Sequence, residues 1–289
     1  MFNINADELK VKIPSDTIGV DMGQSLSKIA FFQGSDLVCS SYSTQNDLRL
    51  LEETLESKRN HFKYINFTGG KSFKLFQSYT TNFKAYLLNE FETNVKGVEI
   101  LYLLEKNQEL PPSLIVTIGT GTSVVSKKDK IEHLGGTAVG GGFFMGLIKV
   151  LFTISDYNEA LNLAKKGNRY NIDLKVSDIY DPKDNRIDLI FREFTAASLG
   201  KIDNNYDLGN MKKEDFINSL ISMIGENIGT IANLIAETND LNNIVFCGGF
   251  LRENRILRKI LSLLCSVNKK KAIFLKNSEF SSAIGALFL

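Results

Sequence analysis

The chain alternates short runs of β-branched and other apolar residues with longer segments whose apolar residues recur at helical spacing. The short runs predict strands within residues 17–20, 26–32, 64–67, 113–126 and 243–247. Helical spacing predicts helices over residues 94–105, 143–152, 155–166, 216–236, 254–264 and 281–289. The helix over 155–166 is expected to begin at Ser155 or Asp156, both good helix caps. Strands that alternate with helices indicate an α/β fold.

Two segments share one plan: a β-branched run, a turn rich in Gly, Ser and Thr, and a second β-branched run. The first joins residues 17–20 to residues 26–32 through a turn that contains Gly23. The second spans residues 113–126 around the turn GTGTS at 119–123. Two copies of one unit in a single chain predict two related domains that face each other.

The pair Pro111-Pro112 lies just before the second copy and is expected to end the helix that precedes it. This places a domain boundary near residue 110. The sequence thus predicts an N-terminal domain over residues 1–110, with the first hairpin, and a C-terminal domain over residues 111–289, with the second hairpin and a glycine-rich loop.

Composition excludes several classes of function. The 34 Lys and Arg residues balance 33 Asp and Glu residues, which leaves no surplus charge for a nucleic acid. No uninterrupted apolar stretch reaches the length of about 20 residues that spans a bilayer, and the first residues are polar, so a cytoplasmic protein is expected. Three widely spaced cysteines and two histidines match neither a disulfide framework nor a Cys/His zinc site.

The first hairpin contains the groups that a Mg²⁺-bound polyphosphate needs. Gly23 lets the backbone approach a phosphate, Ser25 offers an N–H and a hydroxyl, and Lys28 offers a positive charge. Asp21 could hold Mg²⁺ directly or through water. An ordinary hairpin with an Asx turn at Asp21 explains the same residues equally well.

Other glycine clusters lie at strand and helix ends. The second hairpin has the same donors as the first but no acid, and residues 140–142 are three successive glycines at the start of a predicted helix. A helix N-terminus of this kind is suited to anions, and a glycine-rich flexible loop without a ligand is the alternative. We expect three ordered glycines to be there because something approaches closely. Gly248-Gly249 after a buried strand would let an adenine lie against the backbone.

Taken together, the motifs resemble those of type II pantothenate kinases, members of the actin, hexokinase and Hsp70-like ATPase superfamily. The resemblance runs over nearly the whole chain from Ile18 and is carried by IGVDMGQSLSKIAFF, NFTGG, NEFETNVKG, IVTIGTGTSVVS, HLGGTAVGGGFFMGL, ISDYNEALNLAKKGN, IDLKVSDIY and IVFCGGFLREN. It implies a two-domain actin/hexokinase-like (ribonuclease H-like) fold with a nucleotide cleft between the domains. It also implies ATP-dependent phosphorylation of pantothenate to 4′-phosphopantothenate, the first step of coenzyme A biosynthesis, with Mg²⁺, in a homodimer that binds coenzyme A or acyl-coenzyme A.

The resemblance also assigns site residues. The family's catalytic glutamate lies in a Glu-x-Asp motif that matches Glu90-Phe91-Glu92, so Glu90 is expected to accept the proton of the attacking hydroxyl. Glu92 and Asp21 are competing carboxylates, and a role at the helix N-terminus is the alternative for Glu92. The family's nucleotide contacts map onto Asp21, Met22, Gly23, Gln24, Ser25, Leu26, Ser27, Lys28, Thr120, Gly141, Gly142, Phe143, Phe144, Met145, Tyr157 and Gly249.

Two positions depart from the family pattern. Gln24 and Ser25 stand where the family usually has glycine and threonine; Ser25 keeps the hydroxyl, but Gln24 adds a side chain beside the phosphates. His133 matches an arginine that the family uses near the substrate and the transferred phosphate, and an imidazole cannot reproduce a bidentate guanidinium. The alternative is that His133 is a strand-end residue without a role.

The lost arginine keeps a second substrate class open: pantetheine, pantoate or an amino sugar. A third interpretation is a sensor that binds a nucleotide or acyl-coenzyme A without turnover. The retained Glu90, Asp21 and Lys28 argue against the sensor.

Overall fold

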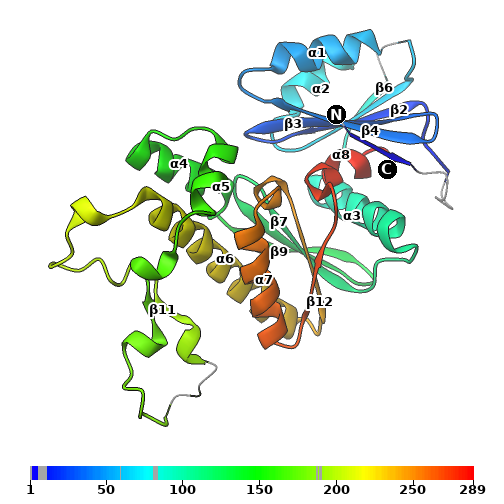
Figure 1. Cartoon of the computed structure of the whole chain (residues 1–289). Helices are drawn as coiled ribbons and strands as arrows, with labels where there is room; N and C mark the ends of the chain where they lie inside the picture. Colours follow the sequence, from blue (N-terminus) through cyan, green and yellow to red (C-terminus); the bar gives the residue numbers. More distant parts are fainter. Residues whose placement is uncertain (1, 6–11, 59, 81–83, 187, 189–190) are drawn as a thin grey trace.

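The computed structural model describes residues 2–5, 12–58, 60–80, 84–186, 188 and 191–289, and its main elements form two mixed β-sheets with helices on their faces (Figure 1). The first sheet has the strand order β1-β4-β3-β2-β5-β6 and the second has β13-β12-β7-β8-β9. The strands of the first sheet are β1 (Phe2–Asn5), β2 (Thr17–Met22), β3 (Leu26–Gln33), β4 (Asp36–Ser43), β5 (Tyr64–Thr68) and β6 (Lys84–Leu87). The strands of the second sheet are β7 (Ser113–Ile118), β8 (Thr122–Lys127), β9 (Ile131–Thr137), β12 (Asn243–Cys247) and β13 (Lys271–Phe274). A separate short hairpin pairs β10 (Leu174–Lys175) with β11 (Thr195–Ala197).

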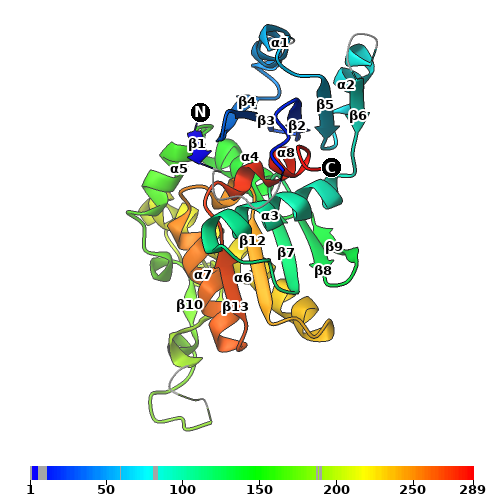
Figure 2. The same ribbon diagram turned by 90° about the vertical axis from the view of Figure 1, so that its right-hand side faces the viewer.

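The helices form three layers around these sheets (Figure 2). α1 and α2 cover the outer face of the first sheet, α3 and α8 lie between the sheets, and α4 to α7 cover the far face of the second sheet. The bounds are α1 (Leu48–Ser57), α2 (Phe73–Tyr79), α3 (Glu90–Lys106), α4 (Gly141–Phe152), α5 (Tyr157–Ala164), α6 (Lys213–Thr238), α7 (Arg255–Val267) and α8 (Ser281–Gly285). The predicted alternation of strands and helices is therefore confirmed.

Helix α3 begins earlier than its apolar spacing predicts and ends for another reason. It begins at Glu90 because the Asn89 side chain accepts hydrogen bonds from the N–H groups of the next turn. It ends at Lys106 because Asn107 adopts the left-handed conformation (φ 52°). The expectation that Pro111-Pro112 breaks this helix is wrong, since the helix has already ended before them.

Two other helix ends show the limits of apolar spacing. Of the two expected caps for α5, Asp156 is the one used: its carboxylate accepts a hydrogen bond of 2.7 Å from the N–H of Glu159. The predicted helix over residues 281–289 is shorter in the structure, because α8 ends at Gly285. Beyond it, the carbonyl of Ala286 accepts a hydrogen bond of 2.7 Å from the buried side chain of Asn66 on β5.

The backbones of α3 and α8 touch where the two helices cross. A Cβ atom at Gly285 would overlap the carbonyl oxygen of Thr93, and one at Gly97 would overlap that of Ser281. α8 follows the second sheet in sequence, yet it packs on α3 and against β2 and β3 of the first sheet. The two predicted domains thus share one core layer, and the boundary near residue 110 stays a prediction.

We expect Gly285→Ala to lower the free energy of unfolding by about 1–3 kcal/mol, because the added methyl forces the α3–α8 crossing apart. Gly146→Ala in α4 is the matched control: a Cβ there meets no atom within 4 Å, so alanine should stabilise the helix by about 0.5–1 kcal/mol. Urea unfolding measures both. A Gly285→Ala variant as stable as the wild type would show that α3 and α8 can move apart at this crossing without loss of stability.

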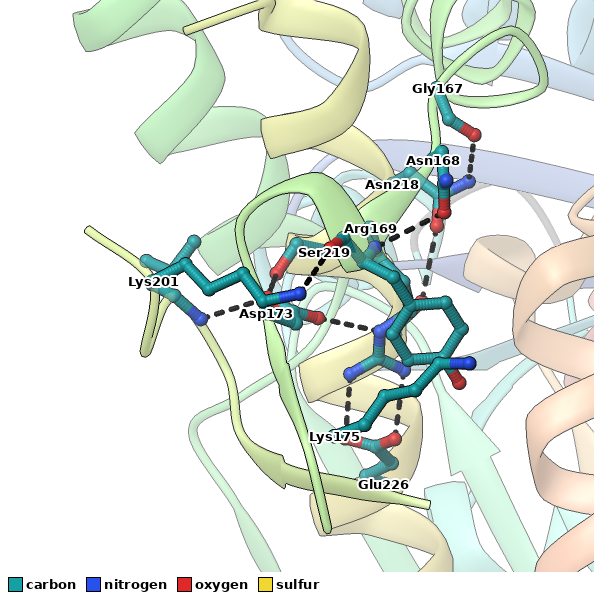
Figure 3. A network of polar contacts seen from close by, with 12 residues as sticks. Gly167, Asn168, Arg169, Asp173, Lys175, Lys201, Asn218, Ser219 and Glu226 are labelled. Atoms are coloured by element: carbon teal, nitrogen blue, oxygen red, sulfur yellow. Dashed lines mark hydrogen bonds and ion pairs between the residues drawn. The ribbon is translucent and has the colours of Figure 1, made fainter. Parts of the chain in front are cut away.

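A buried polar network ties the segment after α5 to α6 (Figure 3). The guanidinium of Arg169 donates to Asp173 at 2.6 Å and to both carboxylate oxygens of Glu226 at 2.8 and 3.1 Å. Asp173 is fully buried and also accepts from the Leu199 N–H at 2.8 Å and from the Ser219 hydroxyl at 2.5 Å. Within the IDLKVSDIY motif, Asp173 anchors the segment of the β10–β11 hairpin to α6 through this network.

Within the described residues, α6 is the one helix long and apolar enough to span a bilayer by length and composition. The expectation of no spanning segment considered only uninterrupted apolar runs. Most of the apolar window of α6 is buried inside the protein, against α5, α7 and the second sheet. The core helix of a globular domain has the same composition.

Candidate functional site

The first hairpin places an ion pair at the end of β2. Asp21 and Lys28 lie directly opposite each other on β2 and β3, and Lys28 Nζ lies 3.1 Å from Asp21 Oδ2. The Asp21 side chain is 8% exposed and that of Lys28 is 14% exposed, so water screens the pair little. Asp21 is a strand residue whose carboxylate pairs with Lys28, and the alternative of an Asx turn at Asp21 is not what the structure shows.

Thr44, just beyond β4, braces the turn of this hairpin. Its hydroxyl donates to the carbonyl of Gly23 at 3.0 Å and lies 3.0 Å from the hydroxyl of Ser27. Met22 and Ser27 are buried, so their contact with a nucleotide stays a prediction. The exposed residues of the turn are Gln24, Ser25 and Leu26.

Glu90 is the first residue of α3 and lies within electrostatic reach of the ion pair. Its pKa is raised from the ordinary 4.5, first by the loss of hydration among neighbouring protein atoms and then by the negative charge of Asp21, while Lys28 opposes the rise. A carboxylate with a raised pKa is a stronger base. Asn89 provides the side-chain cap of α3. Glu92 is an exposed carboxylate in the first turn, which agrees with the alternative of a role at the helix N-terminus.

The three successive glycines at 140–142 pack against the second hairpin. The N–H of Gly141 donates to the carbonyl of Gly119 at 2.8 Å, and the N–H of Gly142 donates to that of Thr120 at 2.9 Å. A Cβ at Gly140 would lie 2.8 Å from the Thr120 oxygen. The close approach that these glycines predict is confirmed, but its partner is the hairpin backbone. The expectation of an open anion site at this helix start is corrected accordingly, because two of its N–H groups already have acceptors.

The two hairpins meet through their hydroxyl groups. Ser25 Oγ of the first lies 3.0 Å from Thr120 Oγ1 of the second, although the two residues are 95 positions apart. Both residues are exposed. The structure therefore brings together two residues that the resemblance assigned to the nucleotide from separate halves of the chain.

Several expected nucleotide contacts lie around the start of α5. The Tyr157 hydroxyl donates to the carbonyl of Phe250 at 2.6 Å, and burial raises its pKa well above the usual range. Its ring is 6.0 Å from that of Phe250 and 6.5 Å from that of Phe144. Phe144 is fully buried in the core and Met145 packs against the same core, so both stabilise this region through packing.

Gly249 and Phe143 are open to a ligand in this region. A Cβ at Gly249 would meet no atom within 4 Å, which leaves the surface that the adenine expectation requires. The Phe143 side chain is 41% exposed. The neighbouring Gly248 is required by packing, because its φ is +105° and a Cβ there would lie 2.5 Å from the carbonyl oxygen of Ile118.

His133 lies beside the Glu90 motif. Its ring stacks on that of Phe91, with centroids 4.1 Å apart and an angle of 16° between the planes. The structure thus brings His133 to the start of α3, where Phe91 covers one face of its ring while the residue stays exposed. A contact with substrate or phosphate stays a prediction.

Comparisons with known proteins bear on this site. The Fumble family model matches residues 38–289. A type II pantothenate kinase from Bacillus cereus (strain AH820) is 33% identical over 279 residues, which cover 94% of this chain and 96% of that protein. The chain belongs to the Fumble family of type II pantothenate kinases. Another member, from Oceanobacillus iheyensis, is 34% identical over 274 residues, with 93% and 98% covered.

Solved structures confirm the fold class. The ROK hexokinase from Thermus thermophilus matches with a TM-score of 0.55 at 12% identity, over 94% of this chain and 97% of that one. A ROK family protein from Streptococcus pneumoniae TIGR4, solved in complex with sucrose, matches with a TM-score of 0.54 at 13% identity, over 94% and 96%. This Fumble family chain therefore has the predicted two-domain actin/hexokinase-like fold.

Asp21 provides a carboxylate of the kind that holds a nucleotide-bound Mg²⁺. Among the residues that the structure describes, no group of three or more His, Cys, Asp and Glu side chains could hold a metal ion. Mg²⁺ in kinases is usually bound by one or two carboxylates together with substrate phosphates and water. Asp21 supplies one such carboxylate, so the residues present fit the group, and Mg²⁺ binding stays a prediction.

Sequence reasoning missed two residues that build the site of this pantothenate kinase family member. Asn89 caps α3, and its signal was present, since an asparagine directly before an acidic first turn is a common helix start. Thr44 braces the first hairpin from the end of β4. Nothing local in the sequence marks Thr44, because its role depends on how β3 pairs with β4.

Proposed function

We propose that this chain transfers the γ-phosphoryl group of ATP to the primary hydroxyl of pantothenate, giving 4′-phosphopantothenate and ADP, with Mg²⁺. The observation that carries the proposal is the position of Glu90, whose pKa is raised beside the Asp21–Lys28 pair in a chain of this family. Family membership alone supports the further parts: a homodimer, binding of coenzyme A or its acyl esters, and a cytoplasmic location.

In this mechanism Glu90 accepts the proton of the attacking hydroxyl. The hydroxyl oxygen forms a bond to the γ-phosphorus while the bond from that phosphorus to the bridging oxygen breaks, and ADP takes the electron pair. Lys28 and the N–H groups and hydroxyls of the exposed residues Ser25 and Thr120 hold the phosphates. Mg²⁺, when bound with the nucleotide, offsets phosphate charge, and Asp21 is the side chain that would hold it directly or through water.

A coupled ADP-release assay tests the substrate. Pantothenate, pantetheine, pantoate and an amino sugar are offered with ATP and Mg²⁺, and we expect the highest kcat/KM with pantothenate. A higher value with another member of the panel would move the function to that substrate. ATP binding without ADP release on any of them would favour the sensor.

Asp21→Asn should lower kcat and change the Mg²⁺ dependence, because it removes the carboxylate next to the phosphates. It should also move the acid limb of the kcat–pH profile to lower pH. Glu90 must be deprotonated to act as a base, and the charge of Asp21 contributes to its raised pKa. The charge of Lys28 lowers the pKa of Glu90, so Lys28→Met should move the acid limb to higher pH.

The control is Asp36→Asn at the far end of β3 and β4, where a carboxylate is lost away from the site. It should leave the Mg²⁺ dependence and the acid limb as they are in the wild type. If Asp21→Asn matches the wild type in both measurements, the metal assignment to Asp21 is wrong.

A further inference from the structure

His133 lies at a β-bulge in the edge strand of the second sheet. Val124 of β8 pairs with Gly135, whereas Val125 pairs with His133, so Leu134 is the extra residue on β9. Gly135 has a φ of +127°, a conformation that favours glycine. Without the bulge, Leu134 would lie opposite Val125. The bulge therefore places the His133 side chain on the same face of the sheet as that of Val125.

That face of the sheet is covered by α3. Val125 belongs to the apolar cluster that contains Val95 of α3, whereas Leu134 packs against the cluster on the opposite face. Phe91, in the first turn of α3, packs against the Val95 cluster, and the His133 ring stacks on it at 4.1 Å. The bulge thus places the flat ring of His133 against Phe91 in the first turn of α3.

Several polar contacts hold the first turn of α3. The Thr93 hydroxyl lies 3.0 Å from the carbonyl oxygens of Asn89 and Glu90 and from the Thr68 hydroxyl. Here the N–H groups of Phe91 and Glu92 are held by the Asn89 side chain, at 2.8 and 3.2 Å. Glu90 precedes Phe91 directly, so a rotation of this turn moves the Glu90 carboxylate away from the groups that it faces. The stack on His133 joins this turn to β9.

We propose, on the basis of the function proposed above, that His133 is a positioning residue: its ring, stacked on Phe91, holds the Glu90 carboxylate in place. It works as a flat surface and not as a charge. This role differs from that expected by analogy with the family's arginine. For a ring without charge, as in His133→Phe, a positioning role predicts that kcat is kept, whereas a charged role predicts that kcat falls.

Steady-state kinetics separates the two roles. His133→Ala should lower kcat by roughly 2- to 13-fold, the range that corresponds to the loss of one aromatic pair, with little change in KM for ATP or pantothenate. His133→Phe should restore kcat, because a benzene ring stacks on Phe91 without charge. Glu132→Ala, at an exposed position on the same strand, is the control and should match the wild type. A His133→Phe variant as impaired as His133→Ala, or a raised KM for pantothenate, would overturn the proposal.

The pH profile gives a readout that a purely structural role would not move. Loss of hydration and the charge of Asp21 raise the pKa of Glu90, and Lys28 lowers it. Glu90 is already exposed to solvent. If the first turn is freed, the carboxylate moves away from the negative charge of Asp21, whose effect on its pKa is larger than that of Lys28. The acid limb of kcat should therefore move to lower pH in His133→Ala and return in His133→Phe. An acid limb that stays in place in His133→Ala would contradict the proposal.

Proton NMR tests the stack without any assay of activity. The chain has only two histidines, His61 and His133, so the ring C–H signals can be assigned with one variant each. The Phe91 ring should shift the His133 signals upfield, and Phe91→Leu should remove that shift while the His61 signals stay in place. A wild-type protein inactive on pantothenate would overturn the proposed function, whereas His133 signals unaffected by Phe91→Leu would overturn the stack.

Discussion

Glu90→Gln should lower kcat for phosphoryl transfer by a factor on the order of 10² to 10⁴ while ATP affinity stays nearly unchanged. Glutamine keeps the size of the side chain and its place at the start of α3, but it cannot accept the proton of the attacking hydroxyl. The nucleotide is held by the hairpins, which this change does not touch. The measurements are kcat with saturating pantothenate and the dissociation constant of ATP.

Glu92→Gln is the matched control, two residues further along the same turn. Its carboxylate is exposed, and the Asn89 side chain accepts from its N–H, which glutamine retains. It should keep wild-type turnover. If Glu90→Gln keeps roughly a third or more of wild-type kcat, or if Glu92→Gln shows the larger loss, the general base has been assigned to the wrong residue.

Asp173→Asn should lower the free energy of unfolding by about 3–5 kcal/mol, the usual cost of breaking a buried ion pair on one side. The variant leaves the guanidinium of Arg169 with Glu226 alone and places an amide where Leu199 and Ser219 both donate. The segment around the β10–β11 hairpin then loses its anchor to α6. Urea unfolding monitored by circular dichroism measures the loss.

Glu193→Gln is a comparison at the surface of the same segment. The Glu193 side chain is 72% exposed and pairs with Lys175, and exposed pairs of this kind contribute little. No measurable change in stability is expected. If Asp173→Asn is as stable as Glu193→Gln, the buried network does not hold this part of the fold.

Local patterns in the sequence were enough for most elements of the core. The strand over 243–247 and the helix over 216–236 follow from apolar runs and helical spacing, and both lie within β12 and α6. Spacing failed at helix ends, where the decisive contacts are polar. Asn89 begins α3 ahead of its apolar stripe, and α8 stops at Gly285 within a run that stays apolar.

The candidate site depended more on tertiary structure. The glycines at 140–142 correctly predicted a close approach, but only the fold shows that the second hairpin is what approaches. The stack of His133 on Phe91 depends on a bulge at Leu134, and strand register is not visible in the local sequence. The Asp21–Lys28 pair follows directly from the hairpin register, which the short turn between the two strands fixes.

The most direct test of the account is phosphorus NMR of a reaction that contains the wild-type chain, ATP, Mg²⁺ and pantothenate. The account predicts a new phosphate monoester on the primary hydroxyl of pantothenate, formed in equal amount to ADP and nearly absent with Glu90→Gln. ADP formed together with free phosphate, or no ADP at all under these conditions, would contradict it.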